Sequence, residues 1–225
     1  MILFEDRLDA GEKLAQKLMP LAHELKDALV IGIPRGGIPV GYGIAGALDA
    51  PLDFIVLRKL PIPDNPEAGF GAVTLDKTTI FNRGILSRLD LGESEVSAIV
   101  DEVYDEVIRR DRVFRGGRPI PDLKNRSVIL TDDGLASGYT MLAAVHYARK
   151  KKVQRVIAAI PVAHENAYSL IERNVDDAIA YHISRASVFA VASFYRRFPD
   201  LSDEEVIDLL DKRKKEMTRK KRRQG

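Results

Sequence analysis

The 225-residue chain contains 45% hydrophobic and 30% charged residues and no cysteine, a composition typical of a soluble globular protein. The lack of cysteine excludes disulfides, thiol catalysis and thiolate metal sites, and no apolar run approaches the ~20 residues that a membrane span requires. The first residues are acidic and lack an apolar signal-peptide core, so we expect a cytoplasmic location and no membrane partner.

Charge is unevenly distributed along the chain. Residues 212–225 hold nine lysines and arginines and one glutamate, whereas residues 1–211 hold 26 basic and 32 acidic side chains. The mildly acidic remainder argues against a nucleic-acid-binding face on the fold itself. We therefore expect one domain over residues 1–211 and a basic tail over 212–225, which is either a solvated helix end or a contact for RNA or another anionic surface.

Apolar runs and helical stripes alternate along the chain. Continuous apolar runs predict buried parallel strands, and apolar residues three and four apart predict helices. In chain order we expect helix 12–25, broken at Pro20; strand 28–33; helix 39–48; strand 52–57; loop 61–70; a hairpin of 72–75 and 78–81; helix 94–110, capped by Ser94; strand 128–131; helix 140–150; strand 155–163; helix 165–173; strand 178–182; and a helix that begins at Ser202. This alternation predicts an α/β fold, with a parallel sheet that carries helices on both faces.

The most informative stretch is VILTDDGLASGYTM, residues 128–141. Its strand ends in Asp132 and Asp133, which places two carboxylates at the carboxyl edge of the sheet, where open α/β sheets bind ligands. A glycine-rich loop that leads into a helix can bind phosphate through backbone N–H groups. The candidate phosphate-binding residues are Gly134, Ala136, Ser137, Gly138 and Thr140. Acids for a diol beside a phosphate loop suit a ribose 5-phosphate; the alternative is a buried strand whose acids only cap the next helix.

Two other strand ends carry basic residues. IPRGG at 33–37 follows the first buried strand, so Arg35 offers a fixed cation and Gly36 lets a ligand approach the backbone. Arg58 and Lys59 close the second strand. Because the carboxyl ends of parallel strands meet at one edge, these residues are expected near the acid pair. The alternatives are an ordinary strand–helix turn and an ordinary basic strand end.

Two further patterns do not indicate a site. GYGIAG at 41–46 matches G-x-G-x-x-G but falls inside a predicted helix, so we do not expect a dinucleotide cofactor. The four histidines, at 23, 146, 164 and 182, have no metal-ligand spacing and are expected to be surface or packing residues.

Residues 128–141 resemble the 5-phosphoribosyl 1-diphosphate (PRPP) binding motif of type I phosphoribosyltransferases, in which apolar residues precede an acid pair and a small-Ser/Thr-Gly-x-Ser/Thr loop. Thr131 and Gly134 depart from the usual apolar and branched residues, and neither change removes a contacting group. Most of residues 28–198 is similar to uncharacterised bacterial and archaeal members that share IPRGG, RK, a D-N-P-E loop and a late FY-x-x-F. The resemblance implies a five-stranded parallel core plus a small hood that selects the acceptor.

The resemblance also implies a reaction, in which the 5-phosphoribosyl group passes from PRPP to a nitrogenous base and pyrophosphate is released. It assigns Asp132 and Asp133 to the ribose hydroxyls and to the developing positive charge, and residues 134–140 to the 5-phosphate. It assigns the pyrophosphate to Arg35, Gly36, Arg58 and Lys59, with Lys59 also counted as catalytic. Mg²⁺ is the expected cofactor, held mainly by the substrate, with Asp132 and Asp133 as candidate ligands through water.

Several questions stay open from the sequence alone. The hood is expected to involve residues 161–164 and 186–198, where Phe189, Phe194 or Tyr195 either stack on a base or belong to the core. No lysine follows the strand at 162–163, a departure from the hypoxanthine-guanine enzymes. Residues 61–73 are expected to form a mobile catalytic lid, with a static surface loop as the alternative. A non-enzymatic sensor of PRPP or a nucleotide is the alternative function, and a homodimer is the expected assembly.

Overall fold

The computed structural model describes residues 1–63 and 65–224. Its centre is a five-stranded parallel sheet in the order β2–β1–β6–β7–β8. The strands are β1 (Leu29–Gly32), β2 (Leu52–Phe54), β6 (Ser127–Thr131), β7 (Arg155–His164) and β8 (Asp177–Ser184). The chain runs from β1 to β2 in one direction and from β6 to β8 in the other. The strand order therefore reverses between β1 and β6, the position where open α/β sheets form ligand sites.

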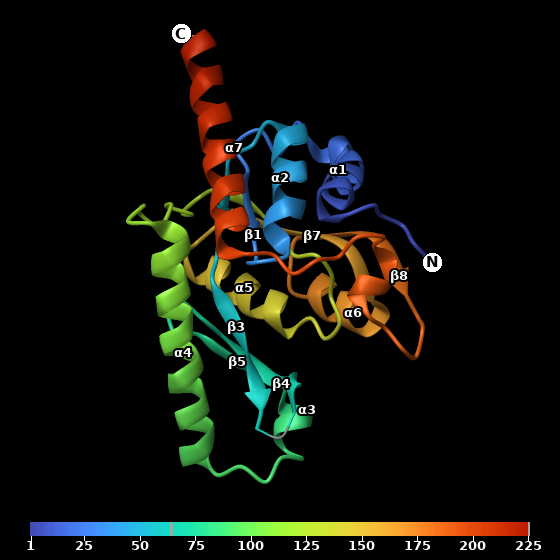
Figure 1. Cartoon of the computed structure of the whole chain (residues 1–225), viewed down its shortest axis with the longest axis vertical. Coiled ribbons are helices and arrows are strands. Elements are labelled where there is room, and N and C mark those ends of the chain that lie inside the picture. The colour runs from blue at the N-terminus through green and yellow to red at the C-terminus, as the bar shows by residue number, and fades with distance from the viewer. Residues whose placement is uncertain (64, 225) are drawn as a thin grey trace.

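Helices cover both faces of this sheet (Figure 1). On one face, α1 (Arg7–Leu18) and α2 (Gly37–Leu48) bury Leu14, Val40 and Ile44 against alternate strand residues. On the other, α5 (Tyr139–Lys150) and α6 (Glu165–Glu172) bury Met141 and Ile171 in a second core. The predicted α/β architecture is confirmed. We call the sheet with these four helices the body.

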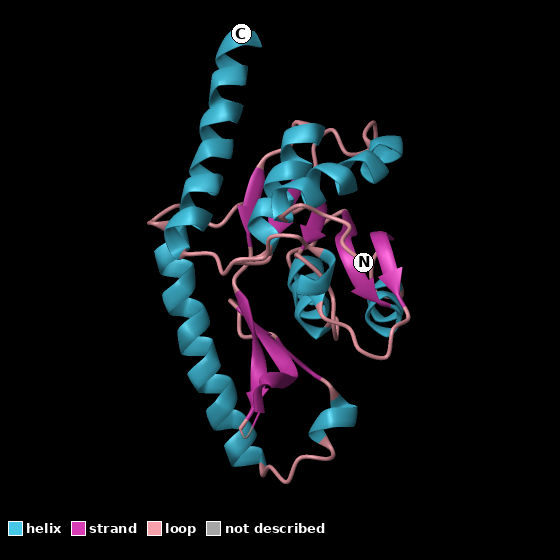
Figure 2. Ribbon diagram, turned by 45° about the vertical axis from the view of Figure 1, so that its right-hand side comes forward, coloured by secondary structure: helices cyan, strands magenta, loops and turns pink. Residues whose placement is uncertain are grey.

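A second sheet, β3–β4–β5, is antiparallel and lies beside the body (Figure 2). It comprises β3 (Leu57–Ile62), β4 (Asn65–Thr74) and β5 (Thr79–Phe81), and it packs with α3 (Arg83–Leu86) and the long helix α4 (Glu93–Arg115). Leu60, Phe70, Val73, Val107 and Phe114 form the shared core. We call β3, β4, β5, α3 and α4 the hairpin lobe.

The prediction of an irregular loop over 61–70 is wrong, because most of this segment pairs as strand. β3 and β4 pair from Leu57 opposite Thr74 to Ile62 opposite Asn65, and the register shifts on both sides of Pro61. Such a bulge accommodates a proline that cannot donate to the ladder. Asp64 lies outside the described residues. The single predicted strand 52–57 is likewise two strands, since β2 ends at Phe54 in one sheet and β3 begins at Leu57 in the other.

Helix starts differ from the predicted ones where a different residue supplies the cap. Helix α1 begins at Arg7, earlier than predicted, because the Asp6 carboxylate accepts from the N–H groups of Leu8 and Asp9. Helix α4 begins after Gly92, not at Ser94, because the Glu95 side chain accepts from the Gly92 N–H at 2.8 Å. Short 3₁₀ turns occupy Met19–Leu21, around Pro20, and Val191–Phe194.

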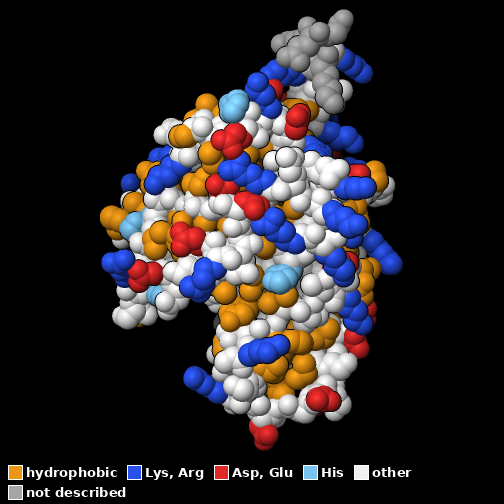
Figure 3. All heavy atoms as spheres, turned by 180° about the vertical axis from the view of Figure 1, so that it is seen from behind, with side chains coloured by type: hydrophobic (Ala, Val, Ile, Leu, Met, Phe, Trp, Pro, Cys, Tyr) orange, Lys and Arg blue, Asp and Glu red, His pale blue; other side chains and the backbone are white. Residues whose placement is uncertain are grey.

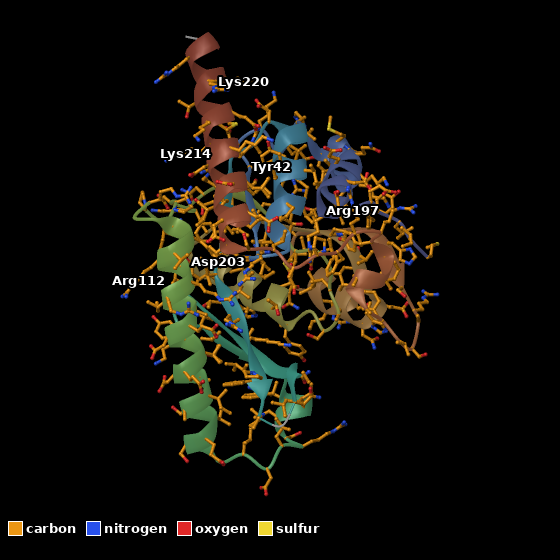
Figure 4. The ribbon with its side chains drawn as sticks, in the orientation of Figure 1. Tyr42, Arg112, Arg197, Asp203, Lys214 and Lys220 are labelled. Atoms are coloured by element: carbon orange, nitrogen blue, oxygen red, sulfur yellow. The ribbon has the colours of Figure 1, made fainter. Side chains whose placement is uncertain are left out.

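Helix α7 (Asp203–Gln224) runs without interruption through the expected domain boundary after residue 211. The predicted cap is confirmed, because the N–H of Glu205 donates to the Ser202 hydroxyl and the Ser202 N–H donates to the Glu205 carboxylate. Beyond the boundary, the Tyr42 hydroxyl of α2 donates to Glu216 at 2.6 Å (Figure 4). None of the described helices is long and apolar enough to cross a membrane.

Candidate functional site at the sheet switch point

The acid pair lies at the carboxyl edge of the body, directly after β6. The Asp133 N–H donates to the Asp132 carboxylate at 2.8 Å. Asp133 Oδ2 accepts from Arg7 Nε at 2.8 Å, and the Tyr195 hydroxyl donates to the Asp133 carbonyl at 2.6 Å. The two acids therefore have different surroundings, since Asp133 is tied to α1 and to the segment after residue 194.

A close approach of the β1–α2 turn fixes the same carboxylate. A Cβ atom on Gly36 would stand 2.0 Å from Asp133 Oδ2, so only glycine lets the start of α2 lie against it. On its other side, the Arg7 guanidinium lies 3.6 Å from the centroid of the Phe198 ring and donates to the Pro199 carbonyl. The position of Asp133 is thus set by three segments that are far apart in sequence.

The electrostatics of the pair favour a ligand that shares or neutralises charge. Burial raises the pKa of Asp132 well above its usual value, and the neighbouring Asp133 carboxylate raises it further. Burial also raises the pKa of Asp133, and the hydrogen bond and charge of Arg7 offset part of that rise. Close buried carboxylates with raised pKa values are stabilised by a cation or by hydroxyl donors.

The loop after the acid pair is anchored at its centre. The Leu135 N–H donates to the Val162 carbonyl and the His164 N–H donates to the Leu135 carbonyl, both at 2.9 Å. Gly138 has φ +81°, a left-handed conformation that favours glycine, and it forms the N-cap of α5. The loop therefore leads directly to a helix N-terminus, where backbone N–H groups and the helix dipole favour an anion.

A cavity of about 380 Å³ opens beside this loop, between the body and the hairpin lobe. Figure 3 shows the surface hollowed between these two parts. The lobe contributes Lys59, Ala68, Gly69, Gly71 and Ile85, and the body contributes Asp132, residues 134–140 and Val191. The volume is in the range of small-molecule sites. The structure thus brings together Asp132, Lys59 and all five candidate phosphate-binding residues.

Of the two departures from the family motif, the one at Gly134 has a structural reason. A Cβ on Gly134 would stand 2.6 Å from a methyl group of Val191, so the 3₁₀ turn after residue 190 fills the space of a branched side chain. Thr131 is fully buried, and its carbonyl accepts from the Ile33 N–H at 2.9 Å as part of the pairing between β6 and β1.

Of the other predicted site residues, Arg35 and Gly36 lie at a second, smaller cavity, and Arg58 lines neither cavity. Arg35 and Gly36 line a cavity of about 210 Å³ together with Arg7, Arg110, Asp200 and Leu201. Arg35 is ion-paired with Asp203 at 2.9 Å and donates to the Leu201 carbonyl at 2.7 Å. Arg58 and Lys59 are consecutive on β3 and so point to opposite faces. Lys59 lines the larger cavity, whereas Arg58 is ion-paired with Glu106 of α4.

The carboxylates of Asp132 and Asp133 are oxygen ligands of the kind that Mg²⁺ prefers. Among residues 1–63 and 65–224, no group of three or more histidines, aspartates and glutamates could hold a metal by itself. Mg²⁺ commonly binds one or two carboxylates and completes its shell with water and substrate phosphates. Asp132 and Asp133 would hold it in this way, and the ion would neutralise phosphate charge when bound.

Sequence reasoning missed several residues of the site. Arg7 helps to fix Asp133, Ile85 forms an apolar wall, and Arg110 reaches the smaller cavity. Tyr195 and Val191 belong to the segment 186–198 that was expected to form the hood, but their contacts with Asp133 and with the larger cavity were not predicted. Phe194 and Tyr195 are 8% and 4% exposed, which favours the interpretation that they belong to the core. His164 caps α6 by accepting from the Asn166 N–H.

Comparisons with known proteins identify the family of the chain. The family model for the phosphoribosyl transferase domain matches residues 4–193. Two Mycobacterium tuberculosis proteins, MT0597 of strain CDC 1551 and Rv0571c of strain H37Rv, are 37% identical over 212 residues, which cover 94% of this chain and 47% of theirs. Their names assign them provisionally to the phosphoribosyl transferases. The crystal structure of TT1426 from Thermus thermophilus matches with a TM-score of 0.77 at 32% identity, covering 93% of this chain and 98% of that one.

The chain therefore belongs to the phosphoribosyl transferase family, which confirms the resemblance seen in residues 128–141. It spans about half the length of the M. tuberculosis relatives that it matches.

Proposed function

We propose that this domain transfers the 5-phosphoribosyl group of PRPP to a nitrogenous base and releases pyrophosphate, with Mg²⁺ as the cofactor. The observation that carries the proposal is the cavity of about 380 Å³, in which Asp132, Lys59 and the loop 134–140 converge at the switch point of the sheet. A phosphate loop, an acid and a lysine are the groups that a phosphorylated sugar with an anionic leaving group needs.

In the proposed reaction, a nitrogen of the base forms a bond to the anomeric carbon of the ribose. The bond from that carbon to the pyrophosphate oxygen breaks, pyrophosphate leaves with the bonding electrons, and the base gives its proton to solvent. Because positive charge develops on the ribose, catalysis rests on positioning and charge stabilisation. Asp132 faces the cavity and would stabilise that charge, while Asp133, held by Arg7, keeps the strand end in place.

The phosphate groups would occupy opposite sides of the acid pair. The N–H groups of residues 134–140 and the hydroxyls of Ser137 and Thr140 would bind the 5-phosphate. Lys59 lines the same cavity from β3 and would stabilise the leaving oxygen as its charge grows. Arg35 and Gly36 would hold the far end of the pyrophosphate. Arg58, which faces Glu106, would contribute charge to this region without lining the larger cavity.

The hairpin lobe has the position of a cover over the reacting centre. Residues of β3, β4 and α3 form one wall of the larger cavity, and the loop 134–140 forms the other. We propose that the β3–β4 hairpin moves towards the body when substrate binds and excludes water. Hydrogen exchange that slows in residues 61–73 on addition of PRPP would support this, and full protection without ligand would contradict it.

The transfer is tested by incubating the protein with PRPP, Mg²⁺ and a panel of purines, pyrimidines and related heterocycles, and by measuring pyrophosphate. At least one acceptor should give a ribonucleotide and pyrophosphate. Lys59→Ala should lower kcat more than it weakens PRPP binding, since its role is in the transition state. Tight PRPP binding without turnover across the panel would instead favour a PRPP sensor.

Cytoplasmic location and assembly into a homodimer stay proposals that rest on the sequence. Gel filtration with light scattering would test the dimer.

A further inference from the structure

Three arginines from distant parts of the chain line the smaller cavity. Arg7 comes from α1, Arg35 from the turn before α2, and Arg110 from the C-terminal part of α4. Gly36, Asp200 and Leu201 complete the lining of this space of about 210 Å³, which we call the arginine pocket. Gly36 also lies against Asp133, so the arginine pocket adjoins the acid pair. The segment that contributes Asp200 and Leu201 leads directly into α7, whose first turn carries Asp203 (Figure 4).

The three arginines differ in how completely they are neutralised. Arg7 is ion-paired with Asp133 at 2.8 Å, and Arg35 with Asp203 at 2.9 Å. Arg110 is held more loosely, since its Nε atom lies 3.6 Å from Glu106 Oε1. That same oxygen is also in ion-pair contact with Arg58 and lies 3.5 Å from Arg109. One carboxylate thus serves three guanidinium groups, and the lining of the arginine pocket holds three arginines against one acid, Asp200.

Exposure separates Arg110 from its neighbour on the helix. The Arg110 side chain is 23% exposed and that of Arg109 is 67% exposed, although both contact Glu106. Burial and the positive charge of Arg35 lower the pKa of Arg110, with Asp203 acting in the opposite direction. Guanidinium groups held together in this way bind oxyanions strongly, because each N–H fork can donate to two phosphate oxygens.

We infer that Arg110, acting with Arg35, binds a diphosphate in the arginine pocket. The inference rests on the proposed function, in which that diphosphate is the leaving group of PRPP. The same chemistry would recognise free pyrophosphate or, less completely, inorganic phosphate. A diphosphate is favoured because the cations are spread over two sides of the arginine pocket, from the turn before α2 and from α4, and because one of its walls is the predicted pyrophosphate-binding turn.

The test compares Arg110→Gln with Arg109→Gln by titration calorimetry of the full chain. Each variant removes one positive charge near Glu106, so a long-range charge effect alters both, whereas a direct contact alters only the first. We expect Arg110→Gln to weaken pyrophosphate binding about tenfold or more, the usual effect of losing a charged hydrogen bond. Arg109→Gln should change it less than about twofold. Ribose 5-phosphate, which would contact the loop 134–140 and Asp132 but not the arginine pocket, should bind both variants as it binds the wild type.

Three outcomes would overturn the inference. One is an equal loss of pyrophosphate affinity in the two variants, and another is a matching loss of ribose 5-phosphate affinity in Arg110→Gln. The third is wild-type affinity for inorganic phosphate equal to that for pyrophosphate, which would assign the arginine pocket to a single phosphate group.

Failure of the inference is distinguishable from failure of the proposed function. If PRPP binds and reacts while Arg110→Gln behaves as wild type, the transfer stands and the role of Arg110 falls. If pyrophosphate binding depends on Arg110 while neither PRPP nor ribose 5-phosphate binds, the arginine pocket stands and the transfer falls.

Discussion

Replacing Gly36 by alanine tests the close packing that fixes the acid pair. The backbone at Gly36 has φ −60° and ψ −33°, a conformation that alanine adopts freely, so the substitution adds a methyl group without backbone strain. That methyl group would stand 2.0 Å from Asp133 Oδ2 and 2.4 Å from its Cγ. Since real Cβ contacts do not fall below 3.0 Å, the carboxylate or the turn must move by about 1 Å.

The size of the effect follows from what that movement breaks. Asp133 Oδ2 is the atom that accepts from Arg7 Nε at 2.8 Å, so a shift of this size removes or lengthens a charged hydrogen bond, worth about 1.5–3 kcal/mol. Overpacking by one methyl group costs about 1–3 kcal/mol, and the two effects overlap because they share one displacement. We expect Gly36→Ala to lower the free energy of unfolding by about 2–3 kcal/mol and to weaken PRPP binding at least about tenfold.

Urea unfolding and calorimetry with PRPP and Mg²⁺ measure the two effects. Gly46→Ala is the matched control, because Gly46 belongs to the same helix and a Cβ there meets nothing within 4 Å. That control should bind PRPP as the wild type does and should unfold with equal or higher free energy, since alanine favours the helix. A Gly36→Ala protein with wild-type stability and affinity would refute the idea that this contact fixes Asp133.

Three further substitutions have expected outcomes. Asp132→Asn should abolish PRPP binding and raise the free energy of unfolding at pH 8 by about 1 kcal/mol. Burial raises the pKa of Asp132, so its ionisation disfavours the folded state as pH rises, and the asparagine removes that cost. Thermal melts in which the gain in stability did not shrink on acidification would contradict this. Burial by itself would raise the pKa of Asp76, but hydrogen bonds from Thr74, Thr78 and Lys150 lower it to about 2. Its stabilisation is therefore complete above about pH 5 and is lost as pH falls towards 2, so Asp76→Asn should cost about 1–2 kcal/mol in urea unfolding at pH 7 and little at pH 2; an equal cost at both would be inconsistent. Arg213 is 6% exposed and donates to the Ala45 and Ala50 carbonyls at 2.9 Å. Arg213→Met should therefore lower the free energy of unfolding by about 2–4 kcal/mol, whereas the control Lys215→Met, at an exposed residue of the same helix, should lower it by less than about 0.5 kcal/mol. Similar losses of stability in the two variants would show that α7 is not anchored at Arg213.

The body and the phosphate loop could be predicted because their signals are local. Buried parallel strands appear as continuous apolar runs, and the residues of the loop 134–140 follow one another in the chain. The acid pair comes at the end of such a run, so its place at the carboxyl edge follows from the direction of the strand. The strand β6, the acid pair and the loop 134–140 follow one another in the chain and also lie next to one another in the site.

The hairpin lobe was harder to predict because its pairing depends on distant partners. Residues 61–70 contain three prolines, which argue against strand, yet β4 pairs with β3 and β5 and buries Phe70 against α4. Tertiary packing overrides local preference here. Residues 52–57 contain no proline or glycine, so no turn residue indicates that the chain leaves one sheet at Phe54 and joins another at Leu57.

The residues that surround the acids are invisible to pattern reading for the same reason. Arg7 and Asp133 are 126 positions apart, and each looks ordinary in its own segment. Arg110 lies on a helix with several charged neighbours, and its place at the arginine pocket distinguishes it from the more exposed Arg109. Such contacts have no short sequence motif.

The central claim is that the loop 134–140, Asp132 and the arginine pocket together bind PRPP. A crystal structure of the protein with PRPP and Mg²⁺ tests it most directly. The account predicts the 5-phosphate within hydrogen-bonding distance of the N–H groups of residues 134–140, the ribose hydroxyls at Asp132, and the diphosphate between Arg35 and Arg110. A diphosphate outside the arginine pocket would remove the role of Arg110, and a 5-phosphate bound away from the loop would contradict the account as a whole.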